Sequence, residues 1–156
     1  MRVVILFGSE MGTAESAADS IADELAAHDV SVYDMTDFDP DDLDVRDVHL
    51  IVCSTYGDGD LPTGAEPFFD ALDTRRPDLT GLCFAVFGLG DSVYGDTFNR
   101  GGELAAEKLT GLGATQFGTH GRHDASTGVR AKEMAREWAA ALPITEGMLS
   151  PALISS

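Results

Sequence analysis

Three short runs of apolar residues constrain the fold of this chain more than any other feature of its sequence. They span residues 2–7, 49–53 and 82–87. Each run has the length of a strand that is buried on both faces of a sheet. A helical stripe over residues 13–27 follows the first run, formed by Ala14, Ala17, Ala18, Ile21, Ala22 and Leu25. Buried strands that alternate with helices predict a parallel sheet with helices on both sides.

The remaining segments continue this alternation. Short strands are expected over residues 30–33 and 115–117, helices over 65–72, 98–112 and 125–142, and an acidic connector with a helical turn over 34–47. We therefore predict a three-layer α/β sandwich around a five-stranded parallel sheet in the order 2-1-3-4-5. One domain would cover residues 1–143 and a C-terminal tail residues 144–156. Ligands of such sheets bind beyond the carboxyl ends of the strands, at the switch point between the first and third strands.

The charge balance excludes one class of partner and leaves two explanations open. The chain has 156 residues with 27 acidic and 10 basic side chains, a net charge of −17, which excludes a nucleic-acid binder. The excess of acidic side chains can adapt the whole surface to high salt, or it can form a docking face for a basic partner. The composition resembles that of halophilic archaeal proteins.

Apolar-run length and cysteine placement indicate the compartment. No apolar run reaches the ~20 residues of a membrane span, and the first run lacks the features of a signal peptide. Cys53 and Cys83 lie inside apolar runs, so we expect reduced core thiols rather than a disulfide or a metal pair. The sequence predicts a cytoplasmic monomer.

The loop after the first apolar run has the composition of a phosphate cradle. It runs from Gly8 to Ala14, offers hydroxyls at Ser9 and Thr13, and opens a helix. Backbone N–H groups at a helix start favour an anion. Neither a Walker loop nor a dinucleotide fingerprint is present. The alternative is an ordinary helix cap, with Gly12 at the N-cap and Glu15 three positions later.

The loop after the second run, residues 53–64, combines a tyrosine with glycines and aspartates. Asp58 and Asp60 have the spacing of a calcium loop, but Pro62 and Thr63 stand where a ligand and a glycine are required. A metal is therefore not expected. Tyr56 precedes a Gly-Asp-Gly hinge whose backbone can reach positive φ.

The loop after the third run, residues 87–98, repeats this pattern with one tyrosine, Tyr94. A surface tyrosine on a plain turn is the alternative in each loop, but two tyrosines on neighbouring loops can sandwich a planar ring. A phosphate cradle at one end and a ring clamp at the other describe a phosphorylated flavin.

The three loops resemble those of the flavodoxin family, with most likeness to MioC-type short flavodoxins and the FMN domains of diflavin reductases. The shared motifs are Gly8-Ser9-x-x-Gly12-Thr13-Ala14-Glu15, Ser54-Thr55-Tyr56-Gly57-x-Gly59-Asp60 and Phe87-Gly88-x-Gly90-Asp91-Ser92-x-Tyr94. The resemblance implies FMN as the cofactor. Its contacts would come from Ser9, Glu10, Met11, Gly12, Thr13, Ala14, Ser54, Thr55, Tyr56, Gly57, Asp58, Gly59, Leu89, Gly90, Asp91, Tyr94 and Phe98.

Two departures from the family pattern affect individual contacts. Met11 stands where the phosphate loop usually carries a hydroxyl, and three residues rather than two separate Tyr94 from Phe98. His120 and His123 follow the last expected strand and are interpreted as surface histidines.

The resemblance implies an electron carrier that receives electrons from a reductase and passes them to acceptor proteins docked near the flavin edge. The chain shows no catalytic residues of its own, so the cofactor would carry the chemistry. A flavodoxin-like NAD(P)H:quinone reductase is the alternative. A non-redox receiver domain would need an acidic pair after the first strand, where this chain has Gly8-Ser9-Glu10-Met11.

Overall fold

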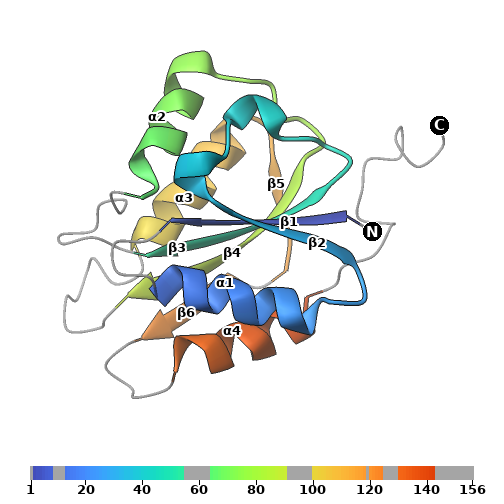
Figure 1. Ribbon diagram of the computed structural model, residues 1–156. Helices are drawn as coiled ribbons and strands as arrows, with labels where there is room; N and C mark the ends of the chain where they lie inside the picture. Colours follow the sequence, from blue (N-terminus) through green and yellow to red (C-terminus); the bar gives the residue numbers. More distant parts are fainter. Residues whose placement is uncertain are drawn as a thin grey trace.

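The fold is described from a computed structural model, which covers residues 2–8, 13–54, 64–90, 100–118, 120–124 and 130–142. Most of the three glycine-rich loops and the whole of the expected tail, 144–156, lie outside these ranges. The sheet is parallel throughout and has the order β2-β1-β3-β4-β5, with β6 also paired to β4. This confirms the expected order (Figure 1). The strands are β1 (Arg2–Gly8), β2 (Asp29–Asp34), β3 (Val48–Ser54), β4 (Cys83–Gly90), β5 (Thr115–Gln116) and β6 (Gly121–Asp124).

The fifth position of the sheet is divided between two short strands. β5 pairs with the start of β4 at Cys83 and Phe84, and β6 pairs with its end, from Phe87 to Gly90. Gly118, whose φ of 68° lies in the left-handed region, separates the two. The sequence predicts only β5, because Gly121-Arg122-His123-Asp124 contains no residue typical of strands.

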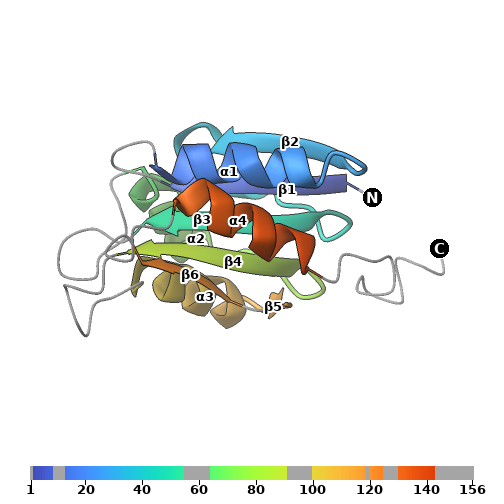
Figure 2. The ribbon, with the colours of Figure 1, turned by 90° about the horizontal axis from the view of Figure 1, so that it is seen from below.

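Helices cover both faces of the sheet. They are α1 (Thr13–Glu24), α2 (Glu66–Arg75), α3 (Arg100–Gly111) and α4 (Ala131–Ala140), and two 3₁₀ helices, Met35–Asp37 and Pro40–Asp42, lie in the acidic connector. α1 and α4 lie side by side on one face, and α2 and α3 lie on the other (Figures 1 and 2). α1 ends three residues before the expected boundary because the chain turns there towards β2. None of the helices in the described ranges is long and apolar enough to span a bilayer.

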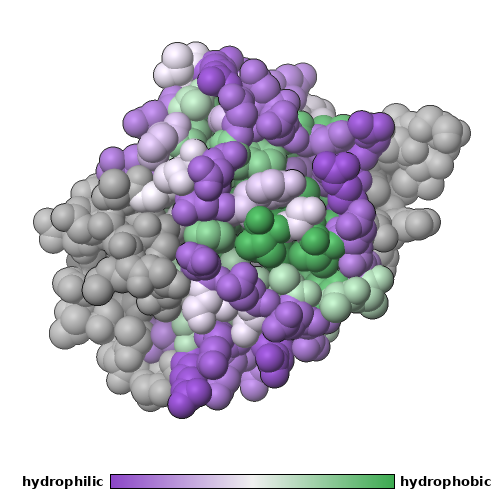
Figure 3. Space-filling model, in the orientation of Figure 1, coloured by the Kyte–Doolittle hydropathy of each residue, from purple (hydrophilic) through white to green (hydrophobic). Residues whose placement is uncertain are grey.

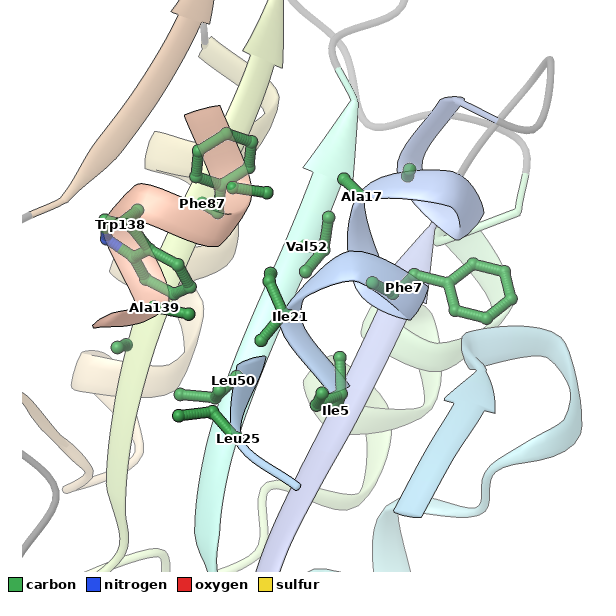
Figure 4. Close-up of a cluster of buried hydrophobic side chains, with 14 of the residues drawn as sticks. Ile5, Phe7, Ala17, Ile21, Leu25, Leu50, Val52, Phe87, Trp138 and Ala139 are labelled. Atoms are coloured by element: carbon green, nitrogen blue, oxygen red, sulfur yellow. The ribbon is translucent and has the colours of Figure 1, made fainter. Parts of the chain in front are cut away.

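Each face of the sheet has its own apolar core. Beneath α1 and α4, Ala17, Ile21 and Trp138 contact Leu50, Val52 and Phe87 of the sheet (Figure 4). The Phe87 and Trp138 ring centroids are 5.4 Å apart. Beneath α2 and α3, the core includes Phe68, Phe69, Leu72, Phe84 and Leu109. Cys53 and Cys83 are buried thiols, as expected. Leu104 of α3 is only partly buried.

The amino end of β3 buries a histidine. His49 is 1% exposed and is flanked by Val4 of β1 and Phe84 of β4. Neither ring nitrogen has a hydrogen-bond partner among the described residues. Burial lowers the pKa of His49 to about 4, although the carboxylate of Asp44 acts in the opposite direction. The folded protein therefore holds this ring neutral.

The carboxyl end of β1 contacts the residue before α2. A Cβ at Gly8 would lie 2.6 Å from the Ala65 Cβ and 3.0 Å from the Met35 Sδ. Only glycine fits at this position. The contact brings Gly8, the residue before the first glycine-rich loop, against Ala65, which follows the second glycine-rich loop.

The outer face drawn in Figure 3 is mostly hydrophilic, with an apolar area over β2.

We predict that His49→Leu removes an acid-sensitive part of the stability. Because the folded pKa is lower than the unfolded value near 6.5, the folded state binds fewer protons, and stability falls as pH drops from about 6.5 to 4. The loss for this one group reaches about 3 kcal/mol at pH 4. Urea unfolding of both proteins across this window measures the difference. Parallel stability curves would contradict the assignment.

We predict that Gly8→Ala lowers the free energy of unfolding by about 1–3 kcal/mol, because the new methyl group overlaps Ala65. Gly111→Ala is the matched control. A Cβ at Gly111 meets nothing within 4 Å, so alanine there should be neutral or stabilise the end of α3 by about 0.5–1 kcal/mol. Equal effects of the two substitutions in thermal unfolding would show that the contact at Gly8 is unimportant.

Candidate functional site

The strand register brings the starts of the three glycine-rich loops to one edge of the sheet. Gly8 is paired with Cys53, and Ser54 with Leu89, one residue before the end of β4. β1, β3 and β4 therefore end within about a residue of one another, at neighbouring positions. The segments 9–12, 55–63 and 91–99, which follow these strand ends in the sequence, lie outside the described residues. The register therefore brings the starting points of the three loops together at the switch point, and the predicted convergence of the loops themselves stays a prediction.

Five of the seventeen residues predicted to bind the cofactor lie in the described ranges, and all five are at this edge. Thr13 and Ala14 open α1, Ser54 ends β3, and Leu89 and Gly90 end β4. The other twelve, Ser9, Glu10, Met11, Gly12, Thr55, Tyr56, Gly57, Asp58, Gly59, Asp91, Tyr94 and Phe98, lie outside the described residues. Their contacts stay predictions.

The start of α1 fits a phosphate. The helix begins five residues after β1 ends, and buried Ala14 anchors its first turn to the core beneath. The N–H groups of a first helical turn lack partners within the helix and point towards the edge from which it starts. This first turn therefore directs donors and the positive end of the helix dipole to the edge where the three loops begin.

β6 brings residues to this edge that are not predicted there from the sequence. His123 is paired with Leu89 and Asp124 with Gly90. The interpretation of His123 as a surface histidine is wrong, because it is only 5% exposed. It shares the inward face of β6 with Gly121, where a Cβ would overlap Phe87 and Trp138. The only feature of the sequence that could have predicted this burial is the alternation of Gly121 and His123 on one face with Arg122 and Asp124 on the other.

His120, the second histidine interpreted as a surface residue, is half-buried. Its Nδ1 lies 3.1 Å from Gln116 Nε2, and its Nε2 is buried and has no hydrogen-bond partner among the described residues. Burial lowers the pKa of His120, and the cation of Arg122 lowers it further. A ring held neutral in this way packs against Gly102 of α3 and is not an exposed proton donor.

Among the described residues near the edge, no side chains form a nucleophilic or metal centre. Cys53 precedes the second loop, but burial raises the pKa of its thiol to about 12, so the thiolate required of a nucleophile is absent at neutral pH. In the part of the chain that the structure describes, no three His, Cys, Asp or Glu side chains are grouped to hold a metal. What the described residues provide at this edge is the backbone N–H groups at the start of α1 and the strand ends from which the three loops begin. These features suit a bound cofactor.

Comparison with known proteins identifies the relatives of this chain. The family pattern described as Flavodoxin matches residues 5–138. An uncharacterised protein of Pseudomonas aeruginosa, PA3435, is 37% identical over 142 residues, which cover 90% of this chain and 95% of that protein. A solved structure of a cysteine-to-serine mutant of flavodoxin from Pseudomonas aeruginosa is 36% identical, with a TM-score of 0.76, and covers 91% of this chain and 99% of that chain.

Two further relatives correspond to the subgroups that the motifs resemble. Protein MioC of Escherichia coli (strain K12) is 29% identical over 116 residues, which cover 74% of this chain and 78% of that protein. NADPH–cytochrome P450 reductase of Rattus norvegicus is 34% identical over 122 residues, which cover 74% of this chain but only 18% of the reductase. The resemblance in composition to halophilic archaeal proteins is not tested by these relatives. The match over most of the chain, together with the strand order, places this protein in the flavodoxin family.

Proposed function

We propose that this chain binds FMN at the carboxyl edge of the sheet and transfers electrons between a reductase and acceptor proteins. Membership of the flavodoxin family supports a flavin cofactor and electron transfer. The observation that carries the proposal is the register, because it brings the starts of all three motif-bearing loops to adjacent positions. Bound FMN would supply the redox chemistry, and the chain would hold and orient it.

The proposal gives each loop a separate role. The segment from Ser9 to Ala14 would hold the phosphate with backbone N–H groups and hydroxyls, next to Thr55. Tyr56 and Tyr94 would cover the two faces of the flavin ring. Backbone from Leu89 to Asp91 would contact the pyrimidine edge, and the peptide next to Gly57 and Asp58 would contact N5.

The acidic residues of these loops would set the direction of electrostatic tuning. Asp58, Asp60, Asp91 and Asp96 belong to the two tyrosine-bearing loops. Carboxylates near the ring disfavour additional negative charge and lower the reduction potential. Salt would screen this effect and raise the potential towards that of a neutral environment. Redox partners would dock over the exposed flavin edge through a small, transient interface.

We predict that the purified protein takes up FMN with the visible bands of a bound flavin, and that Tyr94→Ala weakens the affinity about tenfold or more. Loss of stacking and of buried ring area accounts for this magnitude. Tyr33→Ala is the matched control, because Tyr33 lies on β2 and is 39% exposed. Fluorescence titration measures both dissociation constants, and potentiometry measures the potential. Equal affinities for the two variants would disprove the role of Tyr94.

A second measurement distinguishes a carrier from an enzyme. The FMN-loaded protein alone should not sustain NAD(P)H oxidation, and addition of a flavodoxin reductase should restore electron flow. Steady turnover of NADPH with a quinone and no reductase would favour the quinone-reductase alternative. A protein that remains colourless during FMN titration would overturn the flavin proposal itself.

A further inference from the structure

A polar groove lies between α1 and α4, on the outer surface of the helix layer. The two helices follow parallel strands, so they run in the same direction and begin at the same edge of the sheet (Figures 1 and 2). Their inner faces are fixed by buried residues such as Ala17, Ile21 and Trp138 (Figure 4). The groove has a volume of about 410 Å³, which is at the lower end of the range for small-molecule sites.

The α4 wall of the groove is basic. Arg130, Lys132 and Arg136 line it together with a single acid, Glu133. These three cations are a substantial share of the 10 basic residues in a chain of net charge −17. Arg130 directly precedes the helix and Arg136 lies in its middle, so the positive charge extends along the first half of α4.

The opposite wall, on α1, is acidic and hydroxylic. Asp19 and Asp23 line the groove with Ser16 and Ser20, and this wall has no basic residue. Their spacing along α1 places these four side chains on one stripe of the helix. Ser20 is only 7% exposed and still lines the groove. A serine hydroxyl on the lining of a groove can both donate a hydrogen bond to a ligand and accept one.

The two charged walls do not neutralise each other. Across the described ranges, no ion pair within 4.0 Å joins any of the six charged side chains of the groove. Five basic residues form ion pairs in other parts of the surface: Arg2 with Asp47, Arg46 with Asp44, Arg75 with Asp39, Lys108 with Asp73 and Arg122 with Glu103. The groove is therefore where unpaired charges of opposite sign face each other.

We propose that this groove binds a small zwitterion of the amino acid or short peptide class. The ligand's carboxylate would lie against Arg130 and Arg136, since planar guanidinium groups bind carboxylates with two parallel hydrogen bonds. Its ammonium group would lie against Asp19 and Asp23, and Ser20 would supply the hydroxyl. A simple anion satisfies only one wall and is repelled by the other wall and by the net charge of −17. A zwitterion satisfies both walls without adding charge.

The test uses three probes of similar size that separate the two charges. Glycylglycine carries both charges, N-acetylglycine only the carboxylate, and glycylglycinamide only the ammonium. Each is titrated into the ¹⁵N-labelled full-length protein at about pH 7 and low salt, and backbone amide shifts are followed by NMR. We expect glycylglycine to bind with a dissociation constant on the order of 1 mM and to shift amides of α1 and α4. The two singly charged probes should bind about tenfold more weakly.

Variants assign the binding to the groove. Arg136→Gln and Asp19→Asn each remove one charge from one wall and should each weaken glycylglycine binding about tenfold. Both side chains are exposed, so the fold should be preserved. Lys108→Gln is the matched control, because it removes one positive charge from α3 on the opposite face of the sheet and should leave the affinity unchanged.

The titrations can contradict the proposal in three ways. Equal binding of N-acetylglycine and glycylglycine would overturn the proposal and leave a simple anion site. Absence of saturable shifts, or a loss of affinity in Lys108→Gln equal to that in Arg136→Gln, would also overturn it. The amide-shift measurement does not depend on whether flavin is bound. Failure of FMN binding and failure of groove binding are therefore separate results.

Discussion

The pairing of β3 between β1 and β4 is the constraint on which the rest of the structure depends. Along β3, side chains alternate between the two cores: Leu50 and Val52 belong to the core under α1 and α4, and Ile51 and Cys53 to the core under α2 and α3. A slip of one residue would exchange these sets between cores of different shape. Because the register cannot shift, the three strand ends stay level, and so do the starts of the three loops.

Close contacts of glycine residues adapt the helices and loops to this sheet. Gly8 brings the end of β1 against Ala65, Gly121 lets β6 lie beneath Trp138, and Gly102 brings the first turn of α3 to the backbone of Gly88. All three positions are in or next to segments that end or begin at the carboxyl edge of the sheet. Side chains there would separate the elements that carry the proposed flavin-binding loops. Close packing at these glycines therefore helps to fix the positions from which the loops start.

Charge is distributed unevenly over a molecule whose composition is uniformly acidic. On α2, on α3 and in the acidic connector, basic side chains are paired with carboxylates, which reduces their influence on a partner. On α4, three cations face the acidic stripe of α1 without such pairs among the described residues. The proposed flavin site and the α1–α4 groove both lie near the carboxyl edge of the sheet, from which α1 and α4 start. A ligand that enters the groove would meet these cations and the acidic stripe of α1 together.

The sequence alone determined the order of elements, the parallel sheet, most of the core and the identity of the three loops. These features depend on local periodicity and on turn residues, which are properties of short segments. It did not predict β6, because Gly121-Arg122-His123-Asp124 becomes a strand only when the end of β4 provides a partner. For the same reason it did not predict the burial of His123. Nor did it reveal the groove, whose walls lie more than a hundred residues apart in the chain. Only tertiary packing decides which distant side chains face one another, because that depends on the distance and direction between helices fixed by the shared core.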